Sequence, residues 1–275
     1  MTLMLSSPSI VAAVTAGQSA SEQDLLAEYS QGQPKALIPI AGKPMVAHVI
    51  EALAGSRYVR HILLVALDPA TVGVRFPVEI GYVPDAGGLM ENNLAGFEQA
   101  QARYPDLDGV LLCGCDVPAI TPAIVDAFIE ECFRTDHDVY YSIVARSVME
   151  TRFPGSRRSY VHFREGDFAG GDIILVRPGI KFSQEELGRK LAQARKSALR
   201  QARMVGLGVF LRLLLHRLTI ADTERRVQEV FGLRVRVVPF RYAEIGMDVD
   251  KPFQLEIVRA DLEARLAHGT TPGND

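Results

Sequence analysis

The chain has 275 residues, of which 48% are hydrophobic and 23% are charged, and its formal net charge is −3. This composition is ordinary for a soluble globular protein with one large α/β domain, or with one domain and an appendage. The charge balance gives no general attraction to nucleic acid, so no nucleic-acid partner is expected.

The cysteines and the apolar segments indicate the compartment. Cys113 and Cys115 lie in an apolar run, at a spacing that fits neither a zinc knuckle nor a Cys-x-x-Cys redox pair, so buried strand positions are expected. The chain start lacks the basic region of a signal peptide. The longest apolar stretch, 204–215, is broken by Arg212 and is too short to span a bilayer. We therefore expect a cytoplasmic protein without a transmembrane segment.

The first elements form a predicted strand, loop, short strand and helix. Residues 9–14 are a continuous apolar run, typical of a buried parallel strand, and Ala16 and Gly17 follow in a loop. Residues 33–48 predict a brief strand, a Gly-Lys turn and a helix with proline in its first turn. Their sequence is Gln-Pro-Lys-Ala-Leu-Ile-Pro-Ile-Ala-Gly-Lys-Pro-Met-Val-Ala-His. Lys35, beside the turn and near the glycine-bearing loop, is well placed to contact a phosphate.

The middle of the chain alternates predicted strands and helices. Strands are expected at 61–67, 78–83, 109–115 and 138–146, and helices at 94–104 and 124–133. The strand at 109–115 ends at Asp116. Ligands of open α/β sheets bind outside the carboxyl ends of strands, where a carboxylate close to phosphates is a natural Mg²⁺ ligand. The alternative is that Asp116 caps the next helix, a role for which Thr121 is better placed.

The last third begins with Gly170-Gly171-Asp172 before an apolar strand, where paired glycines allow close backbone approach. The remaining predictions are helices at 183–204, 205–218 and 221–231 (the last capped by Asp222 or Thr223), a strand at 233–239 and a helix at 253–266. We expect one domain over 1–267, with a helical insertion at about 183–232 and a disordered tail at 268–275.

Asp248 and Asp250 precede the last helix in the sequence Asp-Val-Asp-Lys-Pro. If this segment is extended, both carboxylates share one face and both could reach a metal. If the helix begins at Lys251 or Pro252, Asp250 could instead be only its cap.

These stretches together resemble the nucleotidyltransferase superfamily with the GT-A-like fold, which includes molybdenum-cofactor guanylyltransferases and sugar-phosphate nucleotidyltransferases. The similarity is strong at 34–48, 111–118 and 245–252 and covers most of 9–265. It implies a Rossmann-like three-layer α/β/α fold with a mixed, mostly parallel sheet. It also implies Mg²⁺-dependent transfer from a nucleoside triphosphate to a small phosphorylated acceptor, with release of pyrophosphate.

The resemblance implies which residues of this chain bind the nucleotide. Ala16 and Gly17 correspond to a phosphate loop, although the usual second glycine and basic residue are absent. Asp85 and Asn92 match a loop that reaches the base and ribose, with turn chemistry and a helix cap as the alternative. Lys35 would stabilise the triphosphate.

The resemblance also implies a metal site and an acceptor side. Asp116 and Asp250, with Asp248 close by, would hold Mg²⁺. The acceptor candidates are His162, Gly171 and Asp172. The neighbouring pair at 157–158, Arg-Arg, could meet an acidic acceptor, although a solvated charged loop is the commoner explanation.

Two other functions stay open. One is a glycosyltransferase of the same fold that uses residues 248–250 as an Asp-x-Asp metal motif. The other is a nucleotide-binding protein that has lost turnover, because the loop between Gly17 and Gln33 is long and depleted. The sequence is compatible with a homo-oligomer but names neither the base nor the acceptor.

Overall fold

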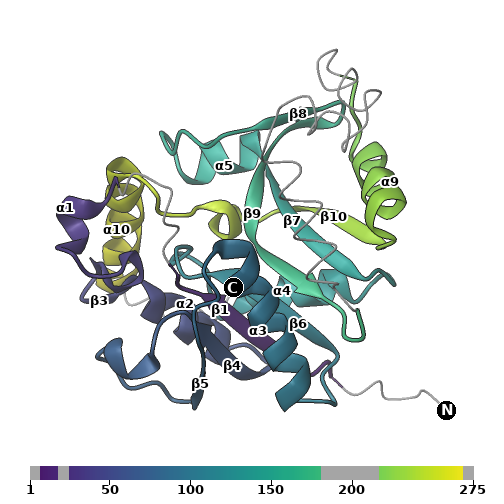
Figure 1. The fold of residues 1–275 in the computed structure, drawn as a ribbon. Helices are drawn as coiled ribbons and strands as arrows, with labels where there is room; N and C mark the ends of the chain where they lie inside the picture. Colours follow the sequence, from purple (N-terminus) through teal and green to yellow (C-terminus); the bar gives the residue numbers. More distant parts are fainter. Residues whose placement is uncertain (1–6, 18–24, 181–216, 269–275) are drawn as a thin grey trace.

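The computed structural model describes residues 7–17, 25–180 and 217–268, and Figure 1 shows its ribbon. Within these residues, eight strands form one sheet with helices on both faces. Across the sheet the strands are β10 (Val235–Phe240), β7 (Val139–Ala145), β9 (Gly166–Val176), β6 (Gly109–Gly114), β1 (Ile10–Thr15), β4 (Val59–Val65) and β5 (Ile80–Val83), and β8 (Val161–Phe163) pairs with β9.

The sheet is mixed and mostly parallel, as predicted. β9 runs antiparallel to β6 and β7, whereas β1, β4, β5 and β6 are parallel to one another. Thr15 pairs with both Val65 and Gly114, and Val65 pairs with Val83. The carboxyl ends of the four parallel strands therefore lie side by side, and the loops that follow them meet at one edge of the sheet.

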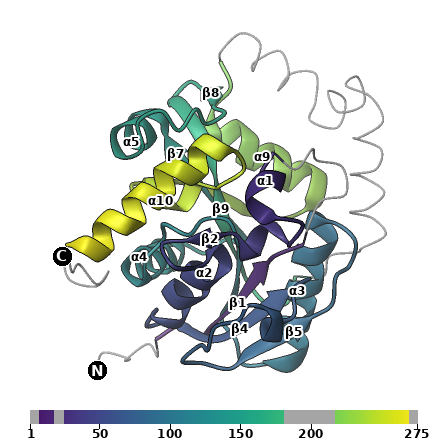
Figure 2. The same ribbon diagram turned by 90° about the vertical axis from the view of Figure 1, so that its left-hand side faces the viewer.

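Helices cover the sheet because its strands alternate between two apolar faces. Ile10, Ala12 and Val14 of β1 belong to the core that includes α2 (Met45–Ala54), α4 (Pro122–Cys132) and α10 (Pro252–Ala267). Val11 and Ala13 face the core under α3 (Leu89–Arg103). Figure 2 shows α2 and α4 on one side of the central strands and α3 on the other. The predicted three-layer α/β/α architecture is confirmed.

A small hairpin carries the chain from Lys35 to α2. The 3-10 helix η1 (Lys35–Leu37) leads to β2 (Pro39–Ile40), which pairs antiparallel with β3 (Lys43–Pro44). Ala41 and Gly42 between them have φ angles of 47° and 86°. Two central residues with positive φ are typical of the tight turns that join antiparallel strands, and glycine accepts that backbone at little cost. The strand, turn and helix predicted over 33–48 are confirmed.

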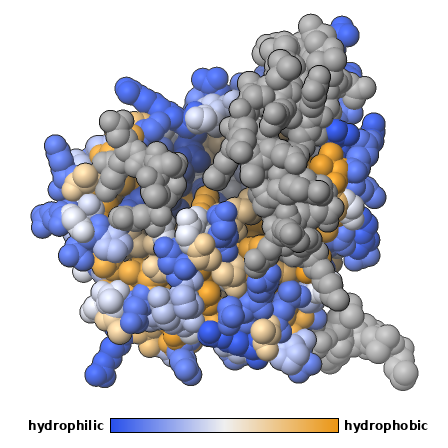
Figure 3. All heavy atoms as spheres, viewed as in Figure 1, coloured by the Kyte–Doolittle hydropathy of each residue, from blue (hydrophilic) through white to orange (hydrophobic). Residues whose placement is uncertain are grey.

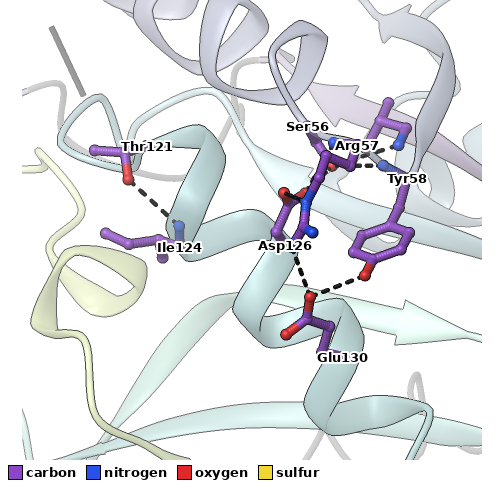
Figure 4. Close-up of polar contacts among 8 residues, drawn as sticks. Ser56, Arg57, Tyr58, Thr121, Ile124, Asp126 and Glu130 are labelled. Carbon is purple, nitrogen blue, oxygen red and sulfur yellow. Dashed lines mark hydrogen bonds and ion pairs between the residues drawn. The ribbon is translucent and has the colours of Figure 1, made fainter. Parts of the chain in front are cut away.

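Polar side chains join the end of α2 to α4 (Figure 4). Asp126 accepts hydrogen bonds from Ser56 Oγ at 2.6 Å and Arg57 Nε at 2.8 Å. Glu130, one turn further along α4, accepts from Arg57 Nη2 at 2.7 Å and Tyr58 Oη at 2.8 Å. Because Asp126 is buried and fully partnered, this cluster fixes the two helices relative to β4.

The N-terminal caps of two helices can be compared with their predictions, of which one is confirmed and one is wrong. Thr121 caps α4 by accepting from the Ile124 amide at 3.3 Å, as predicted (Figure 4). The helix α9 (Ile220–Phe231) is capped by Thr219, whose hydroxyl accepts from the Asp222 amide at 3.0 Å. Capping by Asp222 or Thr223 was therefore wrong. Thr219 and Asp222 form a capping box, which places Asp222 inside the first turn.

Several elements differ from the sequence prediction. α3 begins at Leu89, five positions before residue 94, and α5 (Arg146–Arg152) and the hairpin of β8 with β9 were not predicted. The helices predicted at 183–204 and 205–218 fall outside the described residues, apart from residues 217 and 218, and so does the tail after residue 268. Cys113 and Cys115 are buried, as expected. No described helix combines the length and apolar character needed to cross a membrane.

Candidate active site

Lys35 lies between two aspartates that are far apart in the sequence. Its Nζ atom is 2.7 Å from Asp116 Oδ2 and 2.5 Å from Asp250 Oδ1. Lys35 comes from η1, Asp116 follows β6 by two positions, and Asp250 precedes α10. The structure thus brings together three of the residues proposed from the sequence, at the carboxyl edge of the parallel strands.

The backbone holds the two aspartates at this edge. The Val249 amide donates to the Asp116 carbonyl at 2.9 Å, which fixes the segment before α10 against the loop after β6. The Asp250 amide donates to Gln254 Oε1 at 3.0 Å, and Lys251 is the residue that flanks the start of α10. The Asp250 carboxylate therefore contacts Lys35 and makes no cap hydrogen bond to α10 among the described contacts.

The electrostatics keep Lys35 charged. Burial opposes its positive charge, but the negative charges of Asp116 and Asp250 outweigh this effect and raise the pKa of Lys35. The ammonium group is thus cationic at any physiological pH. A permanently charged lysine at the edge where ligands bind can stabilise the negative charge of a phosphate.

Asp172 lies on β9 next to this group. A Cβ atom built on Gly114 would be 2.5 Å from Asp116 Oδ1 and 3.8 Å from Asp172 Cβ, so the missing side chain at Gly114 leaves room for both residues. Asp172 Oδ2 is buried without a hydrogen-bond partner among the described residues. Burial and the negative charge of Asp116, together with that of Asp250, raise the pKa of Asp172 to about 7.

Asp248 has a different neighbour from Asp250. Its carboxylate forms an ion pair with Arg158, and the two side chains are only 11% and 14% exposed. Residues 247–250 follow the 3-10 helix η3 (Ala243–Gly246) without strand pairing among the described residues, and the two carboxylates do not meet the same neighbour. Asp250 therefore faces Lys35, while Asp248 is neutralised by an arginine.

The nucleotide-side candidates also lie together. A Cβ atom on Gly17 would be 2.5 Å from Asn92 Nδ2 and 3.6 Å from Asp85 Oδ1. Asn92 is 1% exposed; it donates to Asp85 Oδ1 at 2.9 Å and accepts from the Ala86 amide at 2.7 Å. The Gly87 amide and the Asn92 amide group, by donating to Asp85, lower the pKa of that carboxyl. The buried Asn92 side chain thus holds the loop after β5 through Asp85 and Ala86, and Asp85 itself is exposed at the surface.

Ala16, the other nucleotide-side candidate, is 5% exposed and directly precedes Gly17. Its amide donates to the Val65 carbonyl at 3.0 Å, which continues the pairing of β1 with β4. This amide is therefore occupied by the sheet within the described residues.

Gly171 and Asp172 are neighbours on β9, whereas the third acceptor candidate, His162, lies apart from them. His162 Nδ1 is 2.5 Å from Asp167 Oδ1 in the β8–β9 hairpin. Asp167 is five positions along β9 from Asp172, roughly 16 Å at the usual strand rise. Gly171 packs against β7, where an added Cβ would overlap Ser142 Oγ. Of the three candidates, Asp172 alone has a side chain next to the Lys35 group.

Sequence reasoning missed a set of ion pairs that holds α10 in place. Arg152 of α5 donates to Glu244 Oε1 at 2.8 Å and lies 2.7 Å from Asp261 Oδ1 on α10. Arg265 is 2.7 Å from Asp261 Oδ2 and donates to the Ala119 carbonyl at 2.9 Å. The spacing of Asp261 and Arg265 on one helix face was the available signal. By fixing α10, these pairs fix the segment that carries Asp250.

A comparison with known protein families finds a match that covers more than half of the chain. Residues 14–202 match the family described as MobA-like NTP transferase domain. This range contains Gly17, Lys35, Asp85, Asp116 and Asp172 and ends before Asp250.

Individual relatives agree with this match. A protein of Pyrococcus horikoshii named as a probable molybdenum cofactor guanylyltransferase is 29% identical over 100 residues, which are 36% of this chain and 48% of that protein. The chain thus spans about half the length of this curated relative. A hypothetical transferase from Thermus thermophilus has a solved structure with 34% identity and a TM-score of 0.76, covering 90% of this chain and 99% of that one.

A more distant solved structure supports the fold alone. CMP:2-keto-3-deoxy-manno-octonic acid synthetase, in complex with CTP, is 18% identical with a TM-score of 0.57. The alignment covers 94% of this chain and all of that chain.

Proposed function

This chain belongs to the family with the MobA-like NTP transferase domain, and on that premise we propose that it transfers a nucleotidyl group from a nucleoside triphosphate to a small phosphorylated acceptor, releasing pyrophosphate. The observation that carries the proposal is the contact of Lys35 with Asp116 and Asp250 at the carboxyl edge of β6. One lysine and two carboxylates at this edge suit a reaction that needs positioning and charge neutralisation more than a covalent group.

In this proposal the triphosphate lies over the loop that follows β1. A side chain at Gly17 would collide with Asn92, so only glycine lets the backbone of this loop pass so close to Asn92. Lys35 would bind triphosphate oxygens and stabilise the charge that develops on them. Asp85, exposed beside this loop, would contact the base or ribose.

Asp116 and Asp250 would hold Mg²⁺. They fit a cation because they already share one, the ammonium group of Lys35. Among the described residues no group of three or more His, Cys, Asp or Glu could bind a metal. Proteins nevertheless commonly supply only one or two carboxylate ligands to Mg²⁺, and phosphates and water supply the others. When bound, Mg²⁺ would neutralise phosphate charge at the reacting centre.

The glycosyltransferase alternative is not favoured. An Asp-x-Asp metal motif needs both aspartates, yet Asp248 is bound to Arg158 and largely buried. Asp250 alone of the pair contacts Lys35.

The test is pyrophosphate release by the purified protein with Mg²⁺, each common nucleoside triphosphate and a panel of small phosphorylated acceptors. GTP comes first, because the curated relative is named as a guanylyltransferase. We expect release that requires both an acceptor and Mg²⁺ and that is lost in Asp116→Asn. Nucleotide binding without pyrophosphate release across the panel would instead support the nucleotide-binding protein without turnover.

A further inference from the structure

A cavity of about 500 Å³ lies beside α5 and the segment that follows it. Its lining includes Arg146, Arg157 and Arg158, together with Glu150 and Tyr160. Figure 3, drawn in the view of Figure 1, shows hydrophilic surface around α5. Three guanidinium groups around one hollow are suited to an anionic ligand, because arginine binds carboxylate and phosphate oxygens through two hydrogen bonds at once.

The positive charge of this cavity is not fully neutralised by its neighbours. Arg146 Nε donates to Glu150 Oε1 at 2.7 Å and Arg146 Nη1 lies 3.7 Å from Asp167 Oδ2, and Arg158 pairs with Asp248. Arg157 has no ion-pair partner among the described residues, and its guanidinium carbon lies 5.4 Å from the centre of the Phe253 ring. Arg158 Nε is buried without a hydrogen-bond partner in the described part of the chain. Arg157 therefore retains an unpaired positive charge, and Arg158 an unused donor, among the described residues.

The cavity is attached to the candidate active site through two of its arginines. Arg158 binds Asp248, two positions before Asp250, and Arg157 lies over Phe253, three positions after it. The segment that carries Asp250 is thus held against the cavity wall. A group bound in the cavity would contact the arginines that hold this segment, and would leave Asp116 and Asp250, which do not line the cavity, free to act.

The order of strands places the cavity away from the nucleotide side. Gly17 and Asp85 follow β1 and β5, on one side of β6. Asp116 follows β6 itself, and α5 follows β7 on the other side. Asp116 therefore lies between the loop assigned to the triphosphate and the arginine cavity. The second substrate is expected to approach from the cavity side.

We propose that the arginine cavity binds a phosphate group of the acceptor that does not react, so that the acceptor carries an anionic group apart from the oxygen that is attacked. This inference rests on the proposed nucleotidyl transfer and narrows the acceptor class. Arg157 supplies the free charge and Arg146 a second guanidinium. A neutral acceptor would leave the unpaired charge of the cavity without a partner.

The experiment measures binding of inorganic phosphate by calorimetry, up to 50 mM, in the presence of Mg²⁺ and a saturating GTP analogue with a non-hydrolysable α,β bond. Saturation blocks phosphate from the nucleotide loop. The variants are Arg157→Asn, which tolerates the φ of 47° at this position, and Arg146→Gln. The matched control is Arg60→Gln, an exposed arginine on β4 near the opposite edge of the sheet.

Phosphate binding by the wild type and Arg60→Gln, weakened about ten- to hundredfold in both cavity variants, is the expected result. GTP-analogue affinity should be the same in all four proteins. No phosphate binding up to 50 mM, or equal binding by the cavity variants, would overturn the cavity site while leaving nucleotide binding intact. Failure of the wild type to bind any nucleoside triphosphate would instead contradict the proposed function, and with it the acceptor role.

Discussion

The Val249 amide donates to the Asp116 carbonyl at 2.9 Å and joins segments 133 positions apart (249 − 116). This hydrogen bond brings Asp250 to the end of β6, where Lys35 contacts Asp116 and Asp250. The site is thus formed by three loops that are fixed by strand ends, a hairpin and the start of a helix. Such long-range convergence is the usual origin of catalytic sites in α/β proteins.

Lys35→Ala should abolish most turnover. Loss of one cation that stabilises developing phosphate charge costs roughly 3–4 kcal/mol of transition-state stabilisation, or about two to three decades in rate. Steady-state pyrophosphate release measures this effect, and circular dichroism checks the fold. Lys43→Ala is the control, because Lys43 pairs with Glu51 on α2. Full turnover by Lys35→Ala would refute the assignment of Lys35.

Asp250→Asn should affect Mg²⁺-dependent binding, whereas Asp248→Asn should affect stability. Asp250 has a half-exposed side chain, so its change should alter stability little but should reduce the dependence of nucleotide affinity on Mg²⁺. Asp248→Asn leaves Arg158 without its partner. Breaking a buried pair costs about 3–5 kcal/mol, and this nearly buried pair should come at or below the lower end. Calorimetry with and without Mg²⁺, and urea unfolding, measure the two effects. A large loss of Mg²⁺ dependence in Asp248→Asn would reverse the assignment.

Asp172→Asn should stabilise the protein in a pH-dependent way. The folded-state pKa of Asp172 is raised to about 7, so its contribution to stability is fully present below about pH 4 and is lost as the pH rises through 7. The variant should therefore match the wild type near pH 4 and exceed it above pH 7, by on the order of 1–4 kcal/mol in the absence of Mg²⁺. Urea unfolding from pH 4 to 8 measures this, with exposed Asp106→Asn as the control. A constant difference across this range would count against it.

Gly17→Ala should weaken nucleotide binding. Its new Cβ would be 2.5 Å from Asn92 Nδ2, and because Asn92 is buried and bonded to Asp85 and Ala86, the loop must shift. We expect a loss of affinity of at least about tenfold, equal to about 1.4 kcal/mol. The control is Gly109→Ala, at the far end of β6, where the Cβ would be 3.2 Å from Ile10 Cδ1. Unchanged affinity in Gly17→Ala would show that this loop does not approach the nucleotide.

Much of the fold could be predicted because buried parallel strands have continuous apolar sequences. The runs that became β1, β4 and β6 were identified, and Asp116 was placed at the end of the last. The resemblance to nucleotidyltransferases, based mainly on residues 34–48, is confirmed by the family match over 14–202. The positions of Lys35 and Asp116 in the fold could be predicted because both stand next to regular local structure.

The divergence of Asp248 and Asp250 could not be predicted. Alternation in an extended segment would put both carboxylates on one face, but here Asp248 pairs with Arg158 while Asp250 contacts Lys35. The partner of Asp248, Arg158, lies in a loop whose sequence has no periodicity. The start of α5 was hidden for another reason: Ala145 of β7 is followed directly by Arg146 of α5, with no turn residue between them.

Two glycines in the sequence mark the starts of β9 and α3. Gly166, with a φ of 137°, begins β9 directly after the turn of the β8–β9 hairpin. Gly88 precedes Leu89 at the start of α3 and would have extended that helix to its observed beginning.

Thermal unfolding with each of the four common nucleoside triphosphates, with and without Mg²⁺, tests the site as a whole. A ligand that binds only the folded protein raises the unfolding midpoint by mass action. We predict that one triphosphate raises the midpoint, that Mg²⁺ increases this rise, and that Asp116→Asn removes the Mg²⁺ effect. No rise with any of the four, with or without Mg²⁺, would contradict a nucleotide site formed by Lys35, Asp116 and Asp250.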